Sequence, residues 1–168
     1  MPISAKYQAR SRAIIERRLA GLAPNAAAAA SAAIELGAKE LASAIQARAP
    51  SKSGDYRNSI QAVPLAGRND LTSKVIGIKA TKDKNAWGIV ADFIWRFLEF
   101  GTRQHTIKAK NKPALVFTAK DGNKVVTQQV DHPGTAPHPH IFNTYQEMRQ
   151  RIRRRIANAI NKGLKNRV

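Results

Sequence analysis

The chain has 168 residues, a length that suits one domain with a working hydrophobic core. Hydrophobic residues make up 43% of it, but 29 Lys and Arg against 11 Asp and Glu give a net charge of +18, so copies repel one another and attract polyanions. The absence of cysteine excludes disulfides, thiolate metal sites and a thiol nucleophile, and no apolar run approaches the roughly 20 residues of a membrane span.

Two helices are predicted before residue 50. The basic segment from Ser4 to Leu22 carries apolar residues at helical spacing, which predicts a short first helix. The next stretch is rich in alanine, opens at Asn25 as a candidate cap and stops at Pro50. We expect this stretch to form the longest helix, with small side chains that let another helix or subunit approach closely.

The period changes after SKSGD and indicates a sheet. Short apolar or alternating runs follow, separated by Gly, Asp and Asn: IQAVPL, SKVIGIKA, WGIVADFIWRFLEF and ALVFTAKDGNKVVTQQV. In the last run, Asp121-Gly122 lies between two β-rich segments, which is typical of a tight hairpin turn. We therefore predict a mainly antiparallel sheet that contains a hairpin.

The segment GTRQHTIKAKNKP has no hydrophobic periodicity and indicates a flexible loop. It carries His105 and four cationic side chains, Arg103, Lys108, Lys110 and Lys112. We expect it to contact a partner.

The last 28 residues predict a basic amphipathic helix. Its apolar residues recur at steps of three and four. From Arg149 to Val168 there is no acid, and the cationic side chains are Arg149, Arg151, Arg153, Arg154, Arg155, Lys162, Lys165 and Arg167. Such a surface attracts phosphate and can bind nucleic acid without reading its sequence. Two other interpretations stay open, namely a solvated face and a face paired with an acidic neighbouring protein.

The order of helices, strands and helix predicts an α+β fold rather than alternating βαβ units. We expect a single domain over residues 1–168. Its parts would be an N-terminal helical segment at 1–24, a helix and sheet core at 25–140, and the C-terminal helix at 141–168.

Residues Asp131 to His140, DHPGTAPHPH, hold three of the four histidines and first suggest a metal site. An extended backbone could place His138 and His140 on one side, but no third ligand is evident. The prolines and Gly134 explain the stretch equally well as a rigid connector into the C-terminal helix. We predict no metal site and no cofactor.

Motifs for catalysis are missing from the sequence. The 11 acids are scattered rather than clustered as a metal-dependent nuclease requires. There is no GxSxG nucleophile turn and no GxxxxGK phosphate loop. The chain is therefore predicted not to be an enzyme.

Glu99 in FLEFGT ends an apolar run and has two interpretations. A carboxylate there is costly if it is buried without a partner, so it could belong to a buried or inter-subunit pair. Alternatively, an alternating edge strand would leave it facing solvent.

Three landmarks in order carry a family resemblance. APSKSGDYRNSI follows the long helix, FLEFGT ends the apolar run and HPGTAPHP precedes the last helix. Together they resemble the tail-component family of tailed phages, typified by the tenth gene product of a lambdoid phage and related to the minor tail protein Z group. The resemblance covers roughly Ala38 to Gln150. Ser51 and Lys52 depart from the family pattern, and His140 stands where the family prefers phenylalanine.

The residues that match the landmarks are implied to lie at subunit interfaces. They are Pro50, Gly54, Arg57, Asn58 and Ser59 in the first landmark, Glu99, Phe100, Gly101 and Thr102 in the second, and His132, Pro133, Gly134 and Thr135 in the third.

The resemblance implies a structural virion protein, assembled in the host cytoplasm, that forms a ring around the DNA channel where the tail meets the portal complex. The implied partners are other copies of the chain, with a hexamer favoured over a dodecamer, together with portal or connector proteins and tail-terminator or tail-tube proteins. Packaged double-stranded DNA is a further candidate partner. The charge alone supports a different function, a non-specific nucleic-acid-binding protein of ribosomal or nucleoid type.

Overall fold

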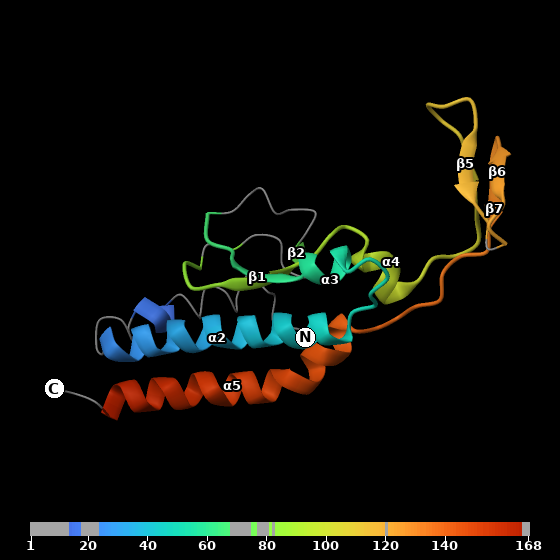
Figure 1. The fold of residues 1–168 in the computed structure, drawn as a ribbon. Helices are drawn as coiled ribbons and strands as arrows, with labels where there is room; N and C mark the ends of the chain where they lie inside the picture. Colours follow the sequence, from blue (N-terminus) through green and yellow to red (C-terminus); the bar gives the residue numbers. More distant parts are fainter. Residues whose placement is uncertain are drawn as a thin grey trace, which may run out of the picture. The chain divides into compact units, whose positions relative to one another are not determined.

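The protein is α+β, as predicted, with every strand pair antiparallel. The computed structural model describes residues 14–17, 24–67, 75–76, 81, 83–119 and 121–165. The helices are α2 (Pro24–Arg48), α3 (Asp55–Ser59), α4 (Trp95–Phe100) and α5 (Ile141–Lys165), and the strands are β1 (Gln61–Pro64), β2 (Val75–Ile76), β3 (Trp87–Val90), β4 (His105–Lys108), β5 (Leu115–Thr118), β6 (Lys124–Thr127) and β7 (Gln129–His132) (Figure 1).

Two predictions fall partly outside these residues. Of the first helix, residues 14–17 are described and are helical, and the remainder of Ser4 to Leu22 lies outside the described part of the chain. Arg167 at the C-terminus also lies outside it.

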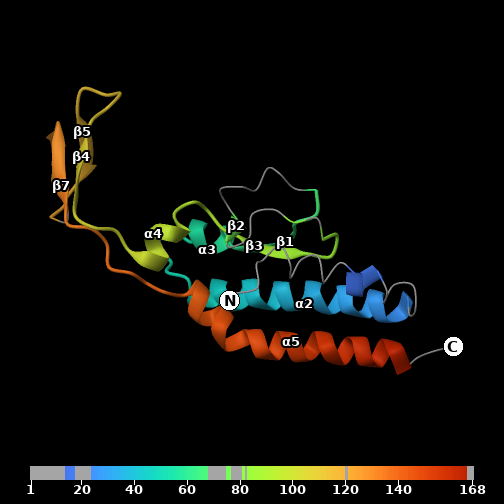
Figure 2. The same ribbon diagram turned by 180° about the vertical axis from the view of Figure 1, so that it is seen from behind.

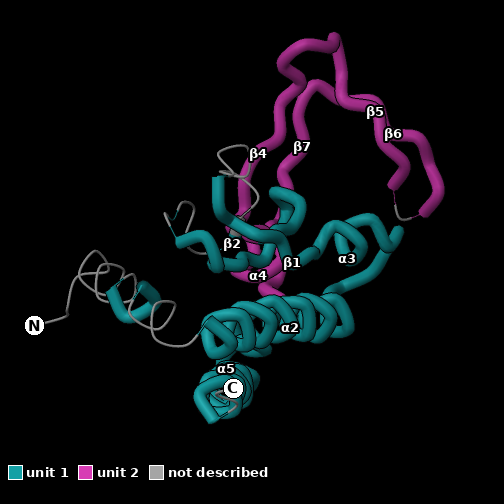
Figure 3. Tube along the Cα trace, turned by 90° about the vertical axis from the view of Figure 1, so that its left-hand side faces the viewer, with its two compact units in different colours: residues 1–95, 140–168 teal, residues 96–139 magenta. Residues whose placement is uncertain are grey.

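The chain divides into two compact units, shown in different colours in Figure 3. Unit 1 comprises Met1–Trp95 and His140–Val168, and unit 2 comprises Arg96–Pro139. The assignment of 1–168 to one domain, with its three parts, stays a prediction.

Helix α2 forms the centre of unit 1. It begins at Pro24, one residue before the predicted cap Asn25, because proline is favoured in the first helical turn, where its missing N–H has no helical partner. Helix α5 runs alongside α2 in both ribbon views (Figures 1 and 2). The buried residues of α2 are mostly small: Ala26, Ala33, Gly37, Leu41, Ala42 and Ile45.

Small residues bring α2 and α5 close together, as predicted for the alanine-rich stretch. A β-carbon added at Gly37 would lie 2.9 Å from Ile152 Cγ2, and one added at Gly163 would lie 2.5 Å from the backbone Cα of Ala26. Neither position can carry a side chain without a shift of its neighbour, so the helix contact depends on both glycines.

A three-stranded sheet of order β1-β3-β2 contacts α2 as well. In its β1–β3 ladder, Gln61 lies opposite Val90 and Pro64 opposite Trp87. The fully buried side chains of Ile45 and Ile60 belong to the hydrophobic core of unit 1.

Unit 2 contains two separate two-stranded ladders. Strands β5 and β6 form the predicted hairpin, and the turn residue Gly122 has φ +85°, a conformation that glycine adopts without strain. Strand β4 pairs with β7, with His105 opposite His132. The predicted single sheet is therefore three small sheets.

Strand β4 corrects the prediction of a flexible loop over GTRQHTIKAKNKP. Residues His105–Lys108 are extended and pair with β7 along their whole length. All four of these side chains are exposed. Alternation of apolar and polar residues is a signal only when one face of a strand is buried, which explains why the sequence did not reveal this strand.

Helix α4 corrects the prediction of a strand at WRFLEF. The less exposed side chains in this segment are Trp95, Leu98 and Glu99, a spacing of three and four that is typical of a helix. The surrounding apolar residues hid this period. The short helix α3 was likewise not predicted.

Candidate functional site

The first landmark forms an internal scaffold in unit 1. Gly54 has φ +91° at the start of α3, and its carbonyl accepts the Asn58 N–H at 2.9 Å. Arg57 donates through Nη2 to the carbonyl of Ala49 at 3.4 Å, which joins the two ends of the motif next to Pro50.

Ser59 connects this landmark to the segment after β3. Its hydroxyl donates to the Tyr56 carbonyl at 2.7 Å and accepts the Asp92 backbone N–H at 2.9 Å. These two hydrogen bonds give Ser59 a structural role in holding α3 in place.

His140, which stands where the family prefers phenylalanine, is only 1% exposed. Its Nε2 shares a hydrogen bond of 2.7 Å with the Tyr56 hydroxyl, and the two rings meet edge to face at 5.6 Å. The imidazole thus occupies an aromatic packing position. Among the described residues, no group of three or more metal-ligating side chains comes together.

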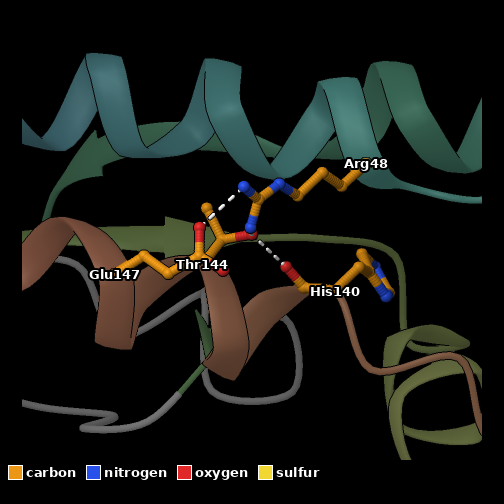
Figure 4. A network of polar contacts seen from close by, with 4 residues as sticks. All are labelled: Arg48, His140, Thr144 and Glu147. Atoms are coloured by element: carbon orange, nitrogen blue, oxygen red, sulfur yellow. Dashed lines mark hydrogen bonds and ion pairs between the residues drawn. The ribbon is translucent and has the colours of Figure 1, made fainter.

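Polar contacts extend from His140 along the start of α5 (Figure 4). The carbonyl of His140 accepts the Thr144 hydroxyl at 2.6 Å, and Arg48 of α2 donates to the same hydroxyl at 3.2 Å. Arg48 also forms an ion pair with Glu147 at 2.6 Å. This pairing lowers the pKa of the Glu147 carboxyl and raises the pKa of Arg48, chiefly through the hydrogen bond between them.

The second and third landmarks pair with each other in unit 2. Thr102 N–H donates to the Thr135 carbonyl at 3.0 Å, and Thr135 N–H donates back to the Thr102 carbonyl at 3.2 Å. Gly101 and Gly134 flank this pair with φ of +72° and +90°.

A side chain at either glycine would collide with backbone. A β-carbon at Gly101 would lie 2.5 Å from the Thr135 carbonyl oxygen, and one at Gly134 would overlap the Thr102 carbonyl oxygen. The two Gly-Thr sequences therefore form one clasp, defined here as residues 101–102 and 134–135. The third landmark also contributes His132, whose Nδ1 accepts the Gly134 N–H at 3.0 Å.

Glu99 of the second landmark is 3% exposed. The interpretation of a solvent-facing edge strand is therefore wrong on both counts, because the residue is helical and buried. The neighbouring Phe100 is 63% exposed.

The four cations of the predicted partner loop are exposed in the structure: Arg103, Lys108, Lys110 and Lys112. Lys108 belongs to β4, and the other three lie in the segments on either side of that strand. The segment is thus an exposed cationic surface that includes strand β4, rather than a loop throughout.

Hydrophobic side chains in the described part of unit 2 are not buried. Val116 and Val126 lie opposite each other in the β5–β6 ladder and are 60% and 66% exposed. Phe117 and Ile107 are 38% and 37% exposed. A two-stranded hairpin is marginally stable by itself in water, so these ladders lack the usual stabilisation by a core.

The basic residues of α5 fall into two groups. Arg151 and Arg155 form ion pairs with Glu40 of α2, at 3.4 and 2.7 Å. The remaining cations form no ion pair with the described residues and are exposed: Arg149, Arg153, Arg154, Lys162 and Lys165. The hydrogen bond from Arg155 holds the pKa of the Glu40 carboxyl below its ordinary value.

Four of these cations line one shallow surface hollow on α5. Its lining residues are Arg151, Arg154, Arg155, Asn158, Ala159 and Lys162. Arg149 and Arg153 are not part of it. This α5 hollow is where the structure brings the predicted phosphate-binding side chains together.

Several residues of these networks gave no signal in the sequence. Glu40 is one of a few scattered acids, and its partner Arg151 lies 111 positions away. Tyr56 and Thr144 likewise gain their roles only from contacts across the fold.

Comparison with known proteins decides the family. The model of the family described as "Bacteriophage HK97-gp10, putative tail-component" matches residues 14–101, which is more than half of the chain. The chain belongs to this family. It is accordingly a structural tail component of a bacteriophage and a virion protein. No curated protein and no solved structure gives a significant match.

The matched range differs from the range of the resemblance in the sequence. It starts earlier, at residue 14, and includes the first landmark and Glu99 to Gly101 of the second. The third landmark lies beyond it. The clasp nevertheless joins Gly101, at the end of the match, to Gly134 outside it.

Membership of this family also bears on the prediction that the chain is not an enzyme. A structural family gives no support for catalysis, and the absence of enzymatic activity stays a prediction. No helix in the described part of this tail component is long and apolar enough to cross a membrane.

Proposed function

We propose that this tail component is a neck or tail-completion protein. Copies assemble in the host cytoplasm into a ring around the DNA channel, and the ring joins the tail to the portal complex. A hexamer is favoured over a dodecamer, and the neighbours above and below the ring are portal or connector proteins and tail-terminator or tail-tube proteins.

The observation that carries the proposal is the exposure of hydrophobic side chains in unit 2. Val116 and Val126 face solvent at opposed positions of a hairpin that has no core in its described residues. Exposed apolar surface of this kind marks a protein interaction site. A structural subunit that buries this surface against its neighbour gains stability for the hairpin and an intersubunit contact at once.

Strand edges in unit 2 supply a second kind of contact. Each of β4, β5, β6 and β7 pairs with one strand only among the described residues, so each keeps one backbone edge without a ladder partner. Such edges can pair with a strand of another chain. A heterologous contact that repeats by rotation closes into a ring, which is the assembly proposed here.

The landmark residues contribute to this function through the shape of the subunit. The scaffold around Gly54, Arg57 and Ser59 positions α3 in unit 1, and the clasp closes the base of the unit 2 segment. We expect the exposed landmark residues to lie at the subunit interface: Arg57, Asn58, Phe100, Pro133 and Thr135.

Deletion of the gene from its phage, followed by electron microscopy of the lysate, tests the proposal. Full heads and separate tails should accumulate, and a plasmid copy of the wild-type gene should restore joined particles. Joined, infectious virions from the deletion strain would contradict the proposal.

The nucleoid-type alternative is favoured only by the charge of +18. It predicts that the chain coats host DNA and is absent from purified particles. Mass spectrometry of purified virions separates the two functions, because the neck protein should be present in a fixed, small number of copies per particle.

A further inference from the structure

The α5 hollow has cationic side chains at both of its ends. Arg151 and Lys162 mark its ends and lie eleven positions apart on the helix, which corresponds to about 16 Å. Between them lie Arg154 and Arg155, with Asn158 and Ala159 in the middle. The two small side chains leave room for a ligand between flanking cations.

Glu40 keeps two of these cations in place. Its Oε2 lies 3.4 Å from Arg151 Nη2, and its Oε1 lies 2.7 Å from Arg155 Nη1. One carboxylate neutralises only part of the charge of two guanidinium groups, so positive charge still predominates in the hollow. The arginines are thereby oriented without being fully paired.

Arg154 and Lys162 complete the hollow and form no ion pair with the described residues. No Asp or Glu follows Glu147 in the sequence, so no acid of α5 lies within one helical turn of either cation. Both side chains are exposed, and each can therefore reach a phosphate oxygen by direct contact.

The chemistry of the lining selects a ligand class. It contains no aromatic side chain on which an unpaired base could stack, and base stacking is the usual means of binding single strands. A row of cations over about 16 Å matches roughly five phosphates of one strand of B-form duplex, which repeats every 3.4 Å along its axis.

We propose that the α5 hollow binds the phosphodiester backbone of double-stranded DNA without reading its sequence. Arg154 and Lys162 contact phosphates directly, and Arg151 and Arg155 contribute while anchored by Glu40. The inference goes beyond a role in joining head and tail, because it assigns a DNA contact to one side of one helix. It does not depend on ring formation.

Fluorescence anisotropy with a labelled duplex of about 20 base pairs tests the proposal over a series of salt concentrations. The variant is Arg154→Ala/Lys162→Ala. Log K falls with log salt, and the loss of two phosphate contacts should make this slope less steep by about 1.8. Affinity should also fall at every salt concentration.

The matched control is Arg149→Ala/Arg153→Ala. It removes the same charge from the same helix at two exposed positions outside the hollow. The slope should stay at the wild-type value. Circular dichroism of both double variants should give the helix content of the wild type.

Three outcomes would overturn the proposal. Equal loss of slope in both double variants would mean that net charge alone drives binding. Absence of duplex binding by the wild type at low salt would exclude the site. Displacement of DNA by polyglutamate of equal charge, at lower concentrations than unlabelled duplex requires, would assign the hollow to an acidic protein instead.

Discussion

His140 shows how packing gives a residue a role that the local sequence does not reveal. In a segment with three histidines it suggested a metal ligand, yet its ring is buried against Tyr56 and bonded to the tyrosine hydroxyl. A buried imidazole at a position where the family prefers phenylalanine keeps the aromatic packing and adds one polar contact. The residue therefore contributes to the packing between α3 and the start of α5.

Tyr56→Phe should lower the free energy of unfolding by about 1 kcal/mol, because it removes one buried hydrogen bond while the ring stays in place. Urea unfolding monitored by circular dichroism measures the change. The control is Tyr145→Phe, whose side chain is 42% exposed, and it should have no measurable effect. Equal destabilisation by both variants would contradict the role assigned to the Tyr56 hydroxyl.

Gly134→Ala should open the clasp, because the added β-carbon meets the Thr102 carbonyl at a positive φ. Gly122→Ala is the matched control, since its φ of +85° imposes similar backbone strain but nothing lies within 4 Å of the added carbon. Hydrogen exchange at the Thr102 and Thr135 amides should become at least about tenfold faster only in the Gly134 variant, since a tenfold change corresponds to about 1.4 kcal/mol. Similar exchange in both variants would show that the close contact is unimportant.

At the scale of elements, ion pairs between α2 and α5 make the helix pair sensitive to acid. Glu40 pairs with Arg151 and Arg155, and Glu147 pairs with Arg48. The pKa values of both carboxyls are lowered by these contacts. A carboxyl with a lowered folded pKa stabilises the fold above its ordinary pKa, and this stabilisation is lost as the pH falls through the folded value.

Glu40→Gln should therefore reduce stability at neutral pH by a fraction of 1 kcal/mol, a small effect because the paired side chains are about one-third exposed. The difference between wild type and variant should be constant above pH 4.5, the ordinary value for Glu, and shrink below it. Urea unfolding across this pH range measures it. Glu35→Gln, which removes an ion pair within α2, is the control for loss of a charge. A difference that persists unchanged in acid would contradict the account.

Whether an element could be predicted depended on how long and how clear its sequence pattern is. Helices α2 and α5 were predicted because both are long and carry sustained composition or periodicity. The β5–β6 hairpin was predicted from its Asp-Gly turn. Strand β4 was missed because it is exposed on both faces, and α4 was missed because apolar residues surround its short helical period.

The candidate site shows the same limit at the scale of pairs. The charge of the α5 cations was evident in the sequence. Which of them pair with Glu40, and which of them line the hollow, follows only from the folded structure. Likewise, the second and third landmarks were recognised separately. Thr102 and Thr135 lie far apart in the sequence, and no local pattern indicates that they pair.

At the scale of the whole molecule, the two units have different sources of stability. Every buried hydrophobic side chain among the described residues lies in unit 1, and the ladders of unit 2 expose Val116, Val126 and Phe117. A charge of +18 opposes association of the copies, so screening by salt should promote it. Because its apolar side chains are exposed, unit 2 is expected to be stabilised by assembly with a neighbouring copy.

Val126→Asp should weaken that assembly, because it places a charge on the exposed apolar face of the β5–β6 hairpin. Leu36→Asp is the control, since Leu36 is a comparably exposed apolar residue on α2, at 50%. The helix content of both variants should match the wild type. Equal loss of assembly in both would mean that unit 2 has no special part in it.

Native mass spectrometry of the purified chain in ammonium acetate of about 0.5 M, where charge repulsion is screened, measures whether the copies assemble through unit 2. We expect a closed assembly of the wild-type chain, with six copies favoured, that is lost in Val126→Asp and kept in Leu36→Asp. A wild-type chain that stays monomeric at every concentration would contradict it.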